Sequence, residues 1–201
     1  NCEPTGEYSC KKILVDNADG SLYVQGCYSP HALRVSETTD ADGLRTLRFE
    51  NRAKKIVLER RIAGDTIADT RYVYDIRGDL RYTISPEGSA LLPDEGDVPE
   101  TVISAYAMRY DYDYRHRVIS SRLPGCGATE YVYDKYGALL MSADAVQRQS
   151  GIWTVTMYDR CQRPAVRGTA IFAGCTPAAL RRTFADSTLV VMPGLQENNL
   201  E

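Results

Sequence analysis

A nine-residue phrase, Tyr-x-Tyr-Asp-x-x-Gly-x-Leu, recurs along this 201-residue chain and constrains its fold more than any other feature. It reads YVYDIRGDL at 72–80 and YVYDKYGAL at 131–139, and a looser copy, YDYDYRHRV, occupies 110–118. A catalytic centre is normally built once, whereas a structural unit can be repeated many times along a chain. The recurrence therefore favours a repeated structural element over an active site.

The second half of each phrase has the pattern of a tight turn. Asp75 and Gly78 fall at the first and fourth positions of a four-residue turn, where Asp accepts backbone N–H bonds and Gly adopts a positive φ. Gly avoids the roughly 1–2 kcal/mol that a Cβ costs in the left-handed region. A turn of this kind followed by a bulge commonly closes a β-hairpin. We therefore predict a hairpin at each copy.

The same turn pattern continues through the rest of the sequence, with gaps of 23, 11, 24, 38, 21 and 25 residues between fourth positions. Gaps near 21–25 residues correspond to two strands and two turns, and regular spacing is typical of a repeat architecture. Because Lys and Gln suit a positive φ less well than Gly, the turns at 51–54 and 159–162 are expected to differ in type. The fourth positions are Gly20, Gly43, Lys54, Gly78, His116, Gly137 and Gln162.

Strand signals flank these turns. Alternation in TRYVYD places Tyr72 and Tyr74 on one face of a strand and Val73 on the other. The basic run RAKKIVLERR at 52–61 is interpreted as the solvent side of a strand pair. The Pro-, Gly- and acid-rich insertion at 86–100 is predicted to be an exposed loop.

The predicted fold is all-β, made of consecutive antiparallel hairpins that form an extended curved sheet. Thr176 suits a cap and Pro177 the first helical position, so a minor helix is predicted near 177–184. A further helical turn is predicted within PETVISAYAMR at 99–109. We divide the chain into an N-terminal hairpin region at 1–46, a repeat sheet at 47–170 and a C-terminal segment with the short helix at 171–201.

Composition argues against two classes of partner. The net charge is −3 with 25% charged residues, so the chain lacks the basic field of a nucleic-acid-binding protein. No stretch approaches about 18 uninterrupted apolar residues, so no membrane insertion is expected. None of the six cysteines forms a C-x-x-C pair, which argues against a zinc site. Two alternatives stay open for them: disulfides within the group Cys2, Cys10 and Cys27, or buried or free thiols.

No pattern in the sequence points to catalysis or to metal binding. The only histidines, His31 and His116, fall in loop or turn positions, and nucleophilic catalysis needs a base beside the nucleophile. The Arg-Gly-Asp tripeptide at 77–79 is explained by its turn. The acidic stretches at 16–20 and 40–43 resemble the start of a calcium loop but have no Glu at the EF-hand distance. We predict no catalytic residue, no metal ligand and no cofactor.

The recurring phrase resembles the YD repeat of the RHS family, which includes bacterial RHS proteins, shell components of insecticidal toxin complexes and animal teneurins. The phrases at 72–80 and 131–139 match in full, the copy at 110–118 has His116 in place of Gly, and VTMYDRCQRP keeps only Tyr158-Asp159. Residues 47–170 are similar to a segment of large exported RHS-repeat proteins of Bacteroides-type bacteria. The resemblance assigns a structural repeat role to Tyr72, Tyr74, Asp75, Gly78, Tyr112, Asp113, Tyr131, Tyr133, Asp134, Gly137, Tyr158 and Asp159.

This resemblance implies a non-enzymatic structural segment of a large exported bacterial protein, located outside the cell or at its surface. In the family, hairpins join side by side into a sheet that winds into a shell, and the shell can enclose a polymorphic toxin domain. The expected partners are adjacent repeats of the same polypeptide. The alternative is an adhesin that binds a glycan or a host surface protein with its Tyr-rich sheet face. Open strands at the ends of the sheet also predict an edge-to-edge dimer.

Overall fold

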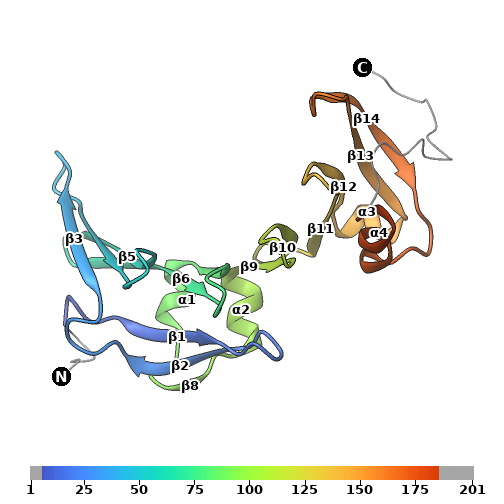
Figure 1. Cartoon of the computed structure of the whole chain (residues 1–201). Coiled ribbons are helices and arrows are strands. Elements are labelled where there is room, and N and C mark those ends of the chain that lie inside the picture. Colours follow the sequence, from blue (N-terminus) through green and yellow to red (C-terminus); the bar gives the residue numbers. More distant parts are fainter. Residues whose placement is uncertain (1–5, 186–201) are drawn as a thin grey trace. The chain divides into compact units, whose positions relative to one another are not determined.

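A computed structural model describes residues 6–185 of the chain. The chain divides into two compact units, Asn1–Tyr110 and Asp111–Glu201. Each unit consists mainly of antiparallel strands with a few short helices (Figure 1), so the predicted all-β class with consecutive hairpins is confirmed. The division into segments at 1–46, 47–170 and 171–201 stays a prediction.

The first unit contains a run of strands that is interrupted by two short helices. Most of its strands follow one another through tight turns, as the hairpin pattern predicts. In chain order the elements are β1 (Lys11–Val15), β2 (Leu22–Cys27), β3 (Arg34–Thr39), β4 (Arg45–Glu50), β5 (Ile56–Ala63), β6 (Thr66–Tyr74), β7 (Leu80–Ile84), α1 (Pro86–Ala90), β8 (Gly96–Asp97), α2 (Glu100–Tyr106) and β9 (Ala107–Tyr112).

The core of the first unit lies between two sheets. Antiparallel pairing joins β3, β4, β5, β6, β7 and β9 in that order, and β1, β2 and β8 form a smaller sheet. The smaller sheet and both helices lie on one side of the larger sheet (Figure 1). Val24 of β2, Val73 of β6 and Ile103 of α2 are buried in the space between them. Tyr72 and Tyr74 flank Val73 and are only half-buried, which confirms the predicted alternation along β6.

The insertion at 86–100 is not the exposed loop that its composition predicts. Residues Pro86–Ala90 form a helix whose N-cap, Ser85, accepts a hydrogen bond from the N–H of Gly88. Leu92 and Val98 then enter the core at 5% and 6% exposure. Pro at the first helical position after a Ser cap is a helix-start signal, so the local sequence carried the correct information. The helix predicted within 99–109 is confirmed by α2.

The second unit is a sheet of sequential hairpins with two short helices. Pairing is antiparallel throughout and follows chain order from β10 to β14. Its elements are β10 (Val118–Arg122), β11 (Ala128–Tyr133), β12 (Leu139–Ala143), α3 (Ala145–Gln149), β13 (Ile152–Tyr158), β14 (Pro164–Ile171) and α4 (Pro177–Phe184).

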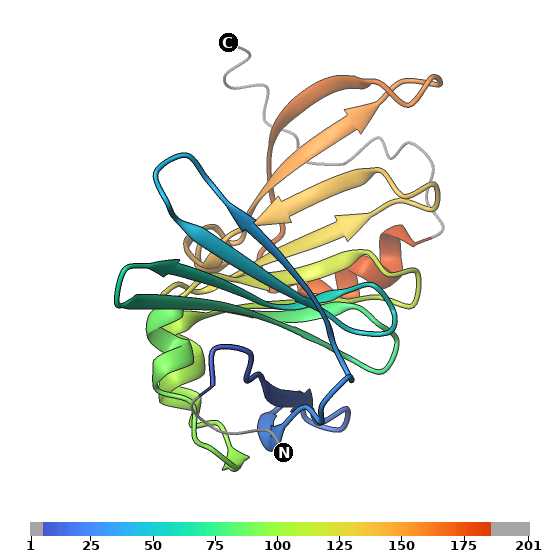
Figure 2. The same ribbon diagram turned by 90° about the vertical axis from the view of Figure 1, so that its left-hand side faces the viewer.

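The helix α4 closes the core of the second unit. Leu180 and Phe184 on its inner face pack on Val132 of β11 and Trp153 of β13, and Figure 2 shows the helix lying across one face of the strands. The hydroxyl of Thr176 accepts a bond from the N–H of Ala179 at 3.2 Å, so the predicted cap and the helix at 177–184 are confirmed.

The described cysteines other than Cys27 form no disulfide. Cys10 is a buried thiol, whereas Cys126, Cys161 and Cys175 are exposed thiols. Cys2 lies outside the described residues, so the alternative of a bridge within the N-terminal group stays open at that position. Over residues 6–185, no helix has the length and apolar character needed to cross a bilayer.

Candidate functional site

Among residues 6–185, six turns share one set of hydrogen bonds. The first residue, Asp or Asn, accepts the fourth residue's N–H on its carbonyl and bonds the fifth residue's carbonyl through its own N–H. Its side-chain Oδ1 also accepts the N–H of the fifth residue, as between Asp134 and Ala138 at 2.8 Å. These turns begin at Asp40, Asn51, Asp75, Asp113, Asp134 and Asp159.

The fourth residue of all six turns has a positive φ. The value is +83° at Gly78 and +96° at Gly137, and it is +58° to +61° at the three positions where the sequence has another residue: Lys54, His116 and Gln162. The expectation that the turns at 51–54 and 159–162 differ in type is therefore wrong. The side-chain and backbone bonds made by the first residue hold these positions in the left-handed region despite the cost of a Cβ.

The first predicted turn differs from these six. It begins at Asp16 rather than Asn17, because the N–H of Gly20 bonds the carbonyl of Asp16 at 2.8 Å and the N–H of Asp16 bonds the carbonyl of Ser21 at 2.8 Å. The turn is one residue longer than its relatives. The carboxylate of Asp16 accepts the N–H of Ala18 at 2.7 Å, and that of Asp19 accepts the N–H of Ser21 at 2.8 Å, so both side chains accept backbone N–H groups here.

Two opposite substitutions test the turn geometry. Gly137→Val is expected to lower the free energy of unfolding by about 1–2 kcal/mol, since its backbone conformation is strained for any residue with a Cβ. A Cβ at this position meets no atom within 4 Å, so strain alone carries the effect. Gln162→Gly should instead raise the free energy of unfolding by up to about 1 kcal/mol. Urea denaturation measures both, and equal midpoints for the two variants and the wild type would refute the turn assignment.

Three tyrosines connect one of these Asp turns to the turn of the same kind before it in the chain. Each stands immediately before the Asp of a turn, and its hydroxyl donates a hydrogen bond to a backbone carbonyl on the neighbouring strand. The accepting residue is in every case the first residue of the strand that follows the preceding turn. The pairs are Tyr74 to Ile56 at 3.1 Å, Tyr133 to Val118 at 2.8 Å and Tyr158 to Leu139 at 3.1 Å.

A basic side chain at the fifth turn position strengthens two of these connections. The guanidinium of Arg117 lies 4.7 Å from the ring centroid of Tyr133 and donates to the carbonyl of Asp134 at 3.1 Å. Lys55 stands in the same relation to Tyr74, with its Nζ 5.0 Å from the ring centroid, and it donates to the carbonyl of Gly78. One cation therefore contacts both the tyrosine ring and the turn that follows it.

Removing one of these hydroxyls tests the connection. Tyr133→Phe is expected to lower the free energy of unfolding by about 0.5–1.5 kcal/mol, because the Val118 carbonyl loses its donor while the ring still packs. Tyr136→Phe is the matched control, since Tyr136 is 62% exposed at the tip of the same hairpin. Thermal and urea unfolding provide the measurement. An identical loss in both variants would show that the hydroxyl of Tyr133 is not a special contact.

The turn carboxylates also tie stability to pH. Burial raises the pKa of Asp113, but hydrogen bonds from the backbone and side chain of Arg117 and the backbone of Arg115 outweigh it, so the pKa of Asp113 is lowered from 3.8. At Asp159 the backbone N–H and guanidinium of Arg163 lower the pKa in the same direction. A lowered folded-state pKa contributes stability above the unfolded-state value, and this is lost as pH falls toward the folded-state value.

Asp113→Asn is therefore expected to lose less unfolding free energy than the wild type when pH falls from about 5 to about 3. The turn itself should survive the change, because Asn51 makes the same Oδ1 bonds at 3.0 Å and 3.1 Å to the N–H groups of Ala53 and Lys55. Urea denaturation at the two pH values measures the difference. Parallel losses in both proteins would contradict a contribution from this carboxylate.

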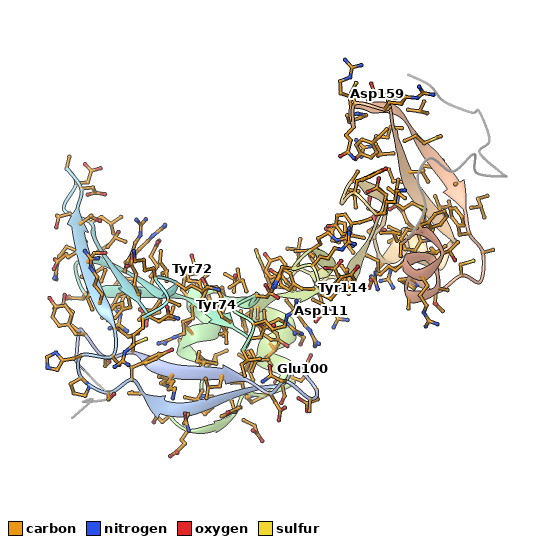
Figure 3. The ribbon with its side chains drawn as sticks, in the orientation of Figure 1. Tyr72, Tyr74, Glu100, Asp111, Tyr114 and Asp159 are labelled. Atoms are coloured by element: carbon orange, nitrogen blue, oxygen red, sulfur yellow. The ribbon has the colours of Figure 1, made fainter. Side chains whose placement is uncertain are left out.

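The remaining predicted repeat residues lie on the strands and not in the turns. Tyr131 lies on the sheet face with its hydroxyl 3.0 Å from that of Ser121, and burial raises the pKa of Tyr72 on β6 (Figure 3). Tyr112 ends β9. The Arg-Gly-Asp tripeptide at 77–79 does not present its carboxylate, because the Asp79 side chain is 10% exposed. The turn accounts for this tripeptide, as the sequence indicates.

A buried ion cluster was not anticipated by the sequence analysis. Arg60 belongs to the basic run at 52–61, which was interpreted as solvent-facing, yet it is 7% exposed. Its Nε and Nη2 bind both carboxylate oxygens of Asp69, at 2.7 Å and 2.6 Å, and Arg71 binds the same carboxylate at 3.1 Å. The interpretation of this run was wrong for Arg60, which shares a strand face with the buried Leu58.

One cavity of the first unit is lined by both a cysteine and a histidine. Its volume is about 390 Å³, and Cys10, Tyr28 and His31 line it. Burial raises the pKa of the Cys10 thiol to about 11, so the thiol is protonated at neutral pH, whereas an activated nucleophile needs a lowered pKa. Within residues 6–185, no group of three or more His, Cys, Asp or Glu side chains is placed to hold a metal ion.

Comparison with protein-family models gives no match, and a search of curated proteins also gives none. Among solved structures, the chain is similar to the crystal structures of TcdB2-TccC3-Cdc42, TcdB2-TccC3 and TcdB2-TccC3-TEV. The sequence identities are 15%, 15% and 16%, and the TM-scores are 0.46, 0.47 and 0.44. Each match covers 89% of this chain and 10% of the other. The likeness is a loose one, and no role passes from those proteins to this chain.

Proposed function

We propose that this chain is a non-enzymatic structural segment of a large exported bacterial protein, in which its hairpins form part of an extended sheet or shell wall. The observation that carries the proposal is the turn-to-turn connection. Tyr74, Tyr133 and Tyr158 each stand before one turn and donate to the first residue of the strand that follows the preceding turn. The most regular residues of the sequence are therefore occupied in holding the sheet together.

This arrangement provides rigidity that grows with the number of repeats. An isolated hairpin is marginal in water, and each cross-strand contact contributes only about 0.2–1 kcal/mol. Within the second unit, the turns at 113–116, 134–137 and 159–162 lie at the same end of the strands (Figure 2). Because consecutive turns are adjacent, the tyrosine before each of the last two turns reaches back to the first strand residue after the turn before it. Such a unit can serve as part of a wall by its structure alone, without any catalytic or binding site.

The absence of an enzyme activity is part of the proposal and is supported by the chemistry of the residues. The turn carboxylates accept backbone N–H bonds and are not paired as an acid and a base. Asp134, for example, is 8% exposed and accepts the N–H groups of Tyr136 and Ala138 through one oxygen. The buried thiol of Cys10 has a raised pKa. Neither arrangement prepares a group for general acid–base or nucleophilic catalysis.

An adhesin is the second candidate, and one observation favours it. Tyr114 and Tyr136 occupy the tips of neighbouring turns and are 76% and 62% exposed, while Arg115 of the first turn bonds the carbonyl of Lys135 in the second at 2.8 Å. Two exposed aromatic rings, on turns that are joined by a hydrogen bond, offer a surface on which a sugar can stack. The sheet-face tyrosines are less suitable, because their hydroxyls already have partners.

A paired experiment separates the two candidates. The wild type, Tyr133→Phe and a Tyr114→Ala/Tyr136→Ala double variant are compared for stability and on a glycan array. The structural proposal expects a loss of stability in Tyr133→Phe and no specific glycan signal in any protein. A glycan signal that the double variant abolishes, together with an unchanged stability of Tyr133→Phe, would replace the structural proposal with the adhesin.

A further inference from the structure

Basic side chains gather at the tips of the Asp turns, at positions that the turn geometry does not require. The first residue of each turn supplies the acceptor and the fourth has the positive φ, so the second and third residues can vary without harm to the turn. Lys and Arg make up only 24 of the 201 residues, yet five of the six turns have one in this central pair. These residues are Arg52, Arg77, Arg115, Lys135 and Arg160.

In the first unit, the basic turns stand at one end of the strands and an acidic turn stands at the other. The turns at 51–54 and 75–78 follow β4 and β6, and both strands run antiparallel to β5, so they end on the same side. The turn at 40–43 precedes β4 and lies at the opposite end. Its central pair is Ala41-Asp42, and the turn at 63–66 beside it also contains an acid and no base.

The second unit shows the same segregation of charge. Its three Asp turns lie at one end of the strands (Figure 2), and residues 113–117, 134–138 and 159–163 hold five basic and three acidic side chains. The connections at the opposite end, 123–127 and 144–151, together hold one acid and one base. The turn end is therefore positive although the whole chain has a net charge of −3.

Two of these tips combine a cation with an exposed aromatic ring. The guanidinium of Arg115 lies 5.3 Å from the ring centroid of Tyr114, and the Nζ of Lys135 lies 5.0 Å from that of Tyr136. Both rings are mostly exposed. Arg115 also donates to the carbonyl of Lys135 at 2.8 Å. The two tips are thus joined and present rings and positive charge together to solvent.

The carboxylates of the same turns do not neutralise these tip cations. They are bonded instead to the basic residue at the fifth turn position or to backbone N–H groups of their own turn. Within the part of the chain that the structure describes, three tip cations form no ion pair: Arg115, Lys135 and Arg160.

We propose that the tip surface of the second unit, formed by Tyr114, Arg115, Lys135, Tyr136 and Arg160, binds the surface of an anionic phospholipid membrane. Anionic headgroups attract Lys and Arg, and Tyr rings favour the boundary between hydrocarbon and water. The chain lies on the bilayer through its turns and does not cross it. This inference goes beyond the proposed structural function and does not depend on it.

The composition of the tip surface favours a membrane over a soluble anionic polymer. Proteins that bind such polymers as nucleic acids have a clustered basic stripe in a basic domain, whereas here single cations stand beside rings in a chain of net charge −3. One Lys or Arg near an anionic leaflet strengthens binding roughly fivefold. Three unpaired cations are therefore expected to strengthen it about a hundredfold.

Flotation of the full chain with phospholipid vesicles tests the tip surface. Vesicles of phosphatidylcholine with about 40 mol% phosphatidylglycerol should bind the wild type at least roughly tenfold more strongly than vesicles of phosphatidylcholine alone. Addition of about 0.5 M NaCl should remove this difference, because salt screens exposed charges. The triple variant Arg115→Gln/Lys135→Gln/Arg160→Gln should lose roughly tenfold or more of its binding at low salt.

A second triple variant, Arg122→Gln/Arg167→Gln/Arg182→Gln, is the matched control. It removes the same charge from three exposed residues outside the turns and should bind as the wild type does. Circular dichroism verifies that every variant is folded.

The variant Tyr114→Ala/Tyr136→Ala separates a membrane from a soluble polymer. It should bind the anionic vesicles roughly fivefold more weakly than the wild type and bind dextran sulfate equally well, since only a bilayer has an interface for the rings. Binding that ignores phosphatidylglycerol, equal losses in the two triple variants, or vesicle binding that does not change without the rings would overturn the proposal. None of these results alters the stability of Tyr133→Phe, on which the structural function is tested.

Discussion

Asp69→Ala is expected to lower the free energy of unfolding by about 3–5 kcal/mol, the cost of breaking a buried ion pair by removing one partner. The carboxylate of Asp69 is the anion between two guanidinium groups, with Arg60 at 2.6 Å and Arg71 at 3.1 Å. The hydrogen bonds of Asp69 raise the pKa of Arg60. Neither arginine can lose its charge, so the variant leaves two buried cations without their counter-ion.

In Asp69→Ala, the surroundings of the cluster prevent the two guanidinium groups from turning out into solvent at low cost. Arg60 also donates to the carbonyl of Glu7 at 2.6 Å and lies over the ring of Phe49, with 5.9 Å between Cζ and the ring centroid. The side chains of Arg60 and Arg71 are 8% and 6% exposed. Unfolding of Asp69→Ala should therefore begin in the β5–β6 hairpin, which hydrogen exchange can locate.

Glu37→Ala is the matched control for this prediction. It removes the partner of Arg45 at 2.6 Å in an ion pair whose side chains are 35% and 38% exposed, and exposed pairs contribute about 0–1 kcal/mol. Urea denaturation compares both variants with the wild type. If Asp69→Ala lowered the free energy of unfolding no more than Glu37→Ala does, the cluster would behave as solvated surface charges and not as a buried ion cluster.

The turns were predictable from the sequence because their stabilising contacts are local. Asp134 binds residues two and four positions ahead of it, so a short stretch of sequence contains the whole interaction. The same reasoning correctly identified the helix at 177–184 from Thr176 and Pro177. Local acceptors and backbone preferences are what single-sequence patterns record well.

Contacts across strands were harder to anticipate. Arg60 meets Asp69 because the β5–β6 hairpin places them directly opposite each other, and this register depends on a turn at 63–66 that lacks the Asp-x-x-Gly pattern. The prediction of an exposed loop at 86–100 was wrong for a related reason. Its polar composition indicates a loop, yet Leu92 and Val98 are buried against side chains distant in sequence, such as Val24. Tertiary burial overrode composition at both sites.

Trp153→Ala is the second large effect, with an expected loss of about 3–5 kcal/mol in the free energy of unfolding. Trp153 is the largest of the fully buried side chains and is 1% exposed. It stands opposite Ala170 of β14 in the sheet and belongs to the core that α4 closes with Leu180 and Phe184. Small residues opposite it cannot fill the space, so the substitution leaves a cavity under the helix.

Trp153→Ala needs its own choice of measurement and a matched control. Trp153 is the sole tryptophan, so its removal abolishes the tryptophan fluorescence signal, and unfolding is followed by circular dichroism. Trp153→Phe should lose less than half as much stability, because it retains an aromatic ring in the same place. Since α4 rests on this core, amides of Pro177–Phe184 should exchange faster in Trp153→Ala. A loss below about 1 kcal/mol, typical of surface positions, would mean that α4 does not depend on the tryptophan for its packing.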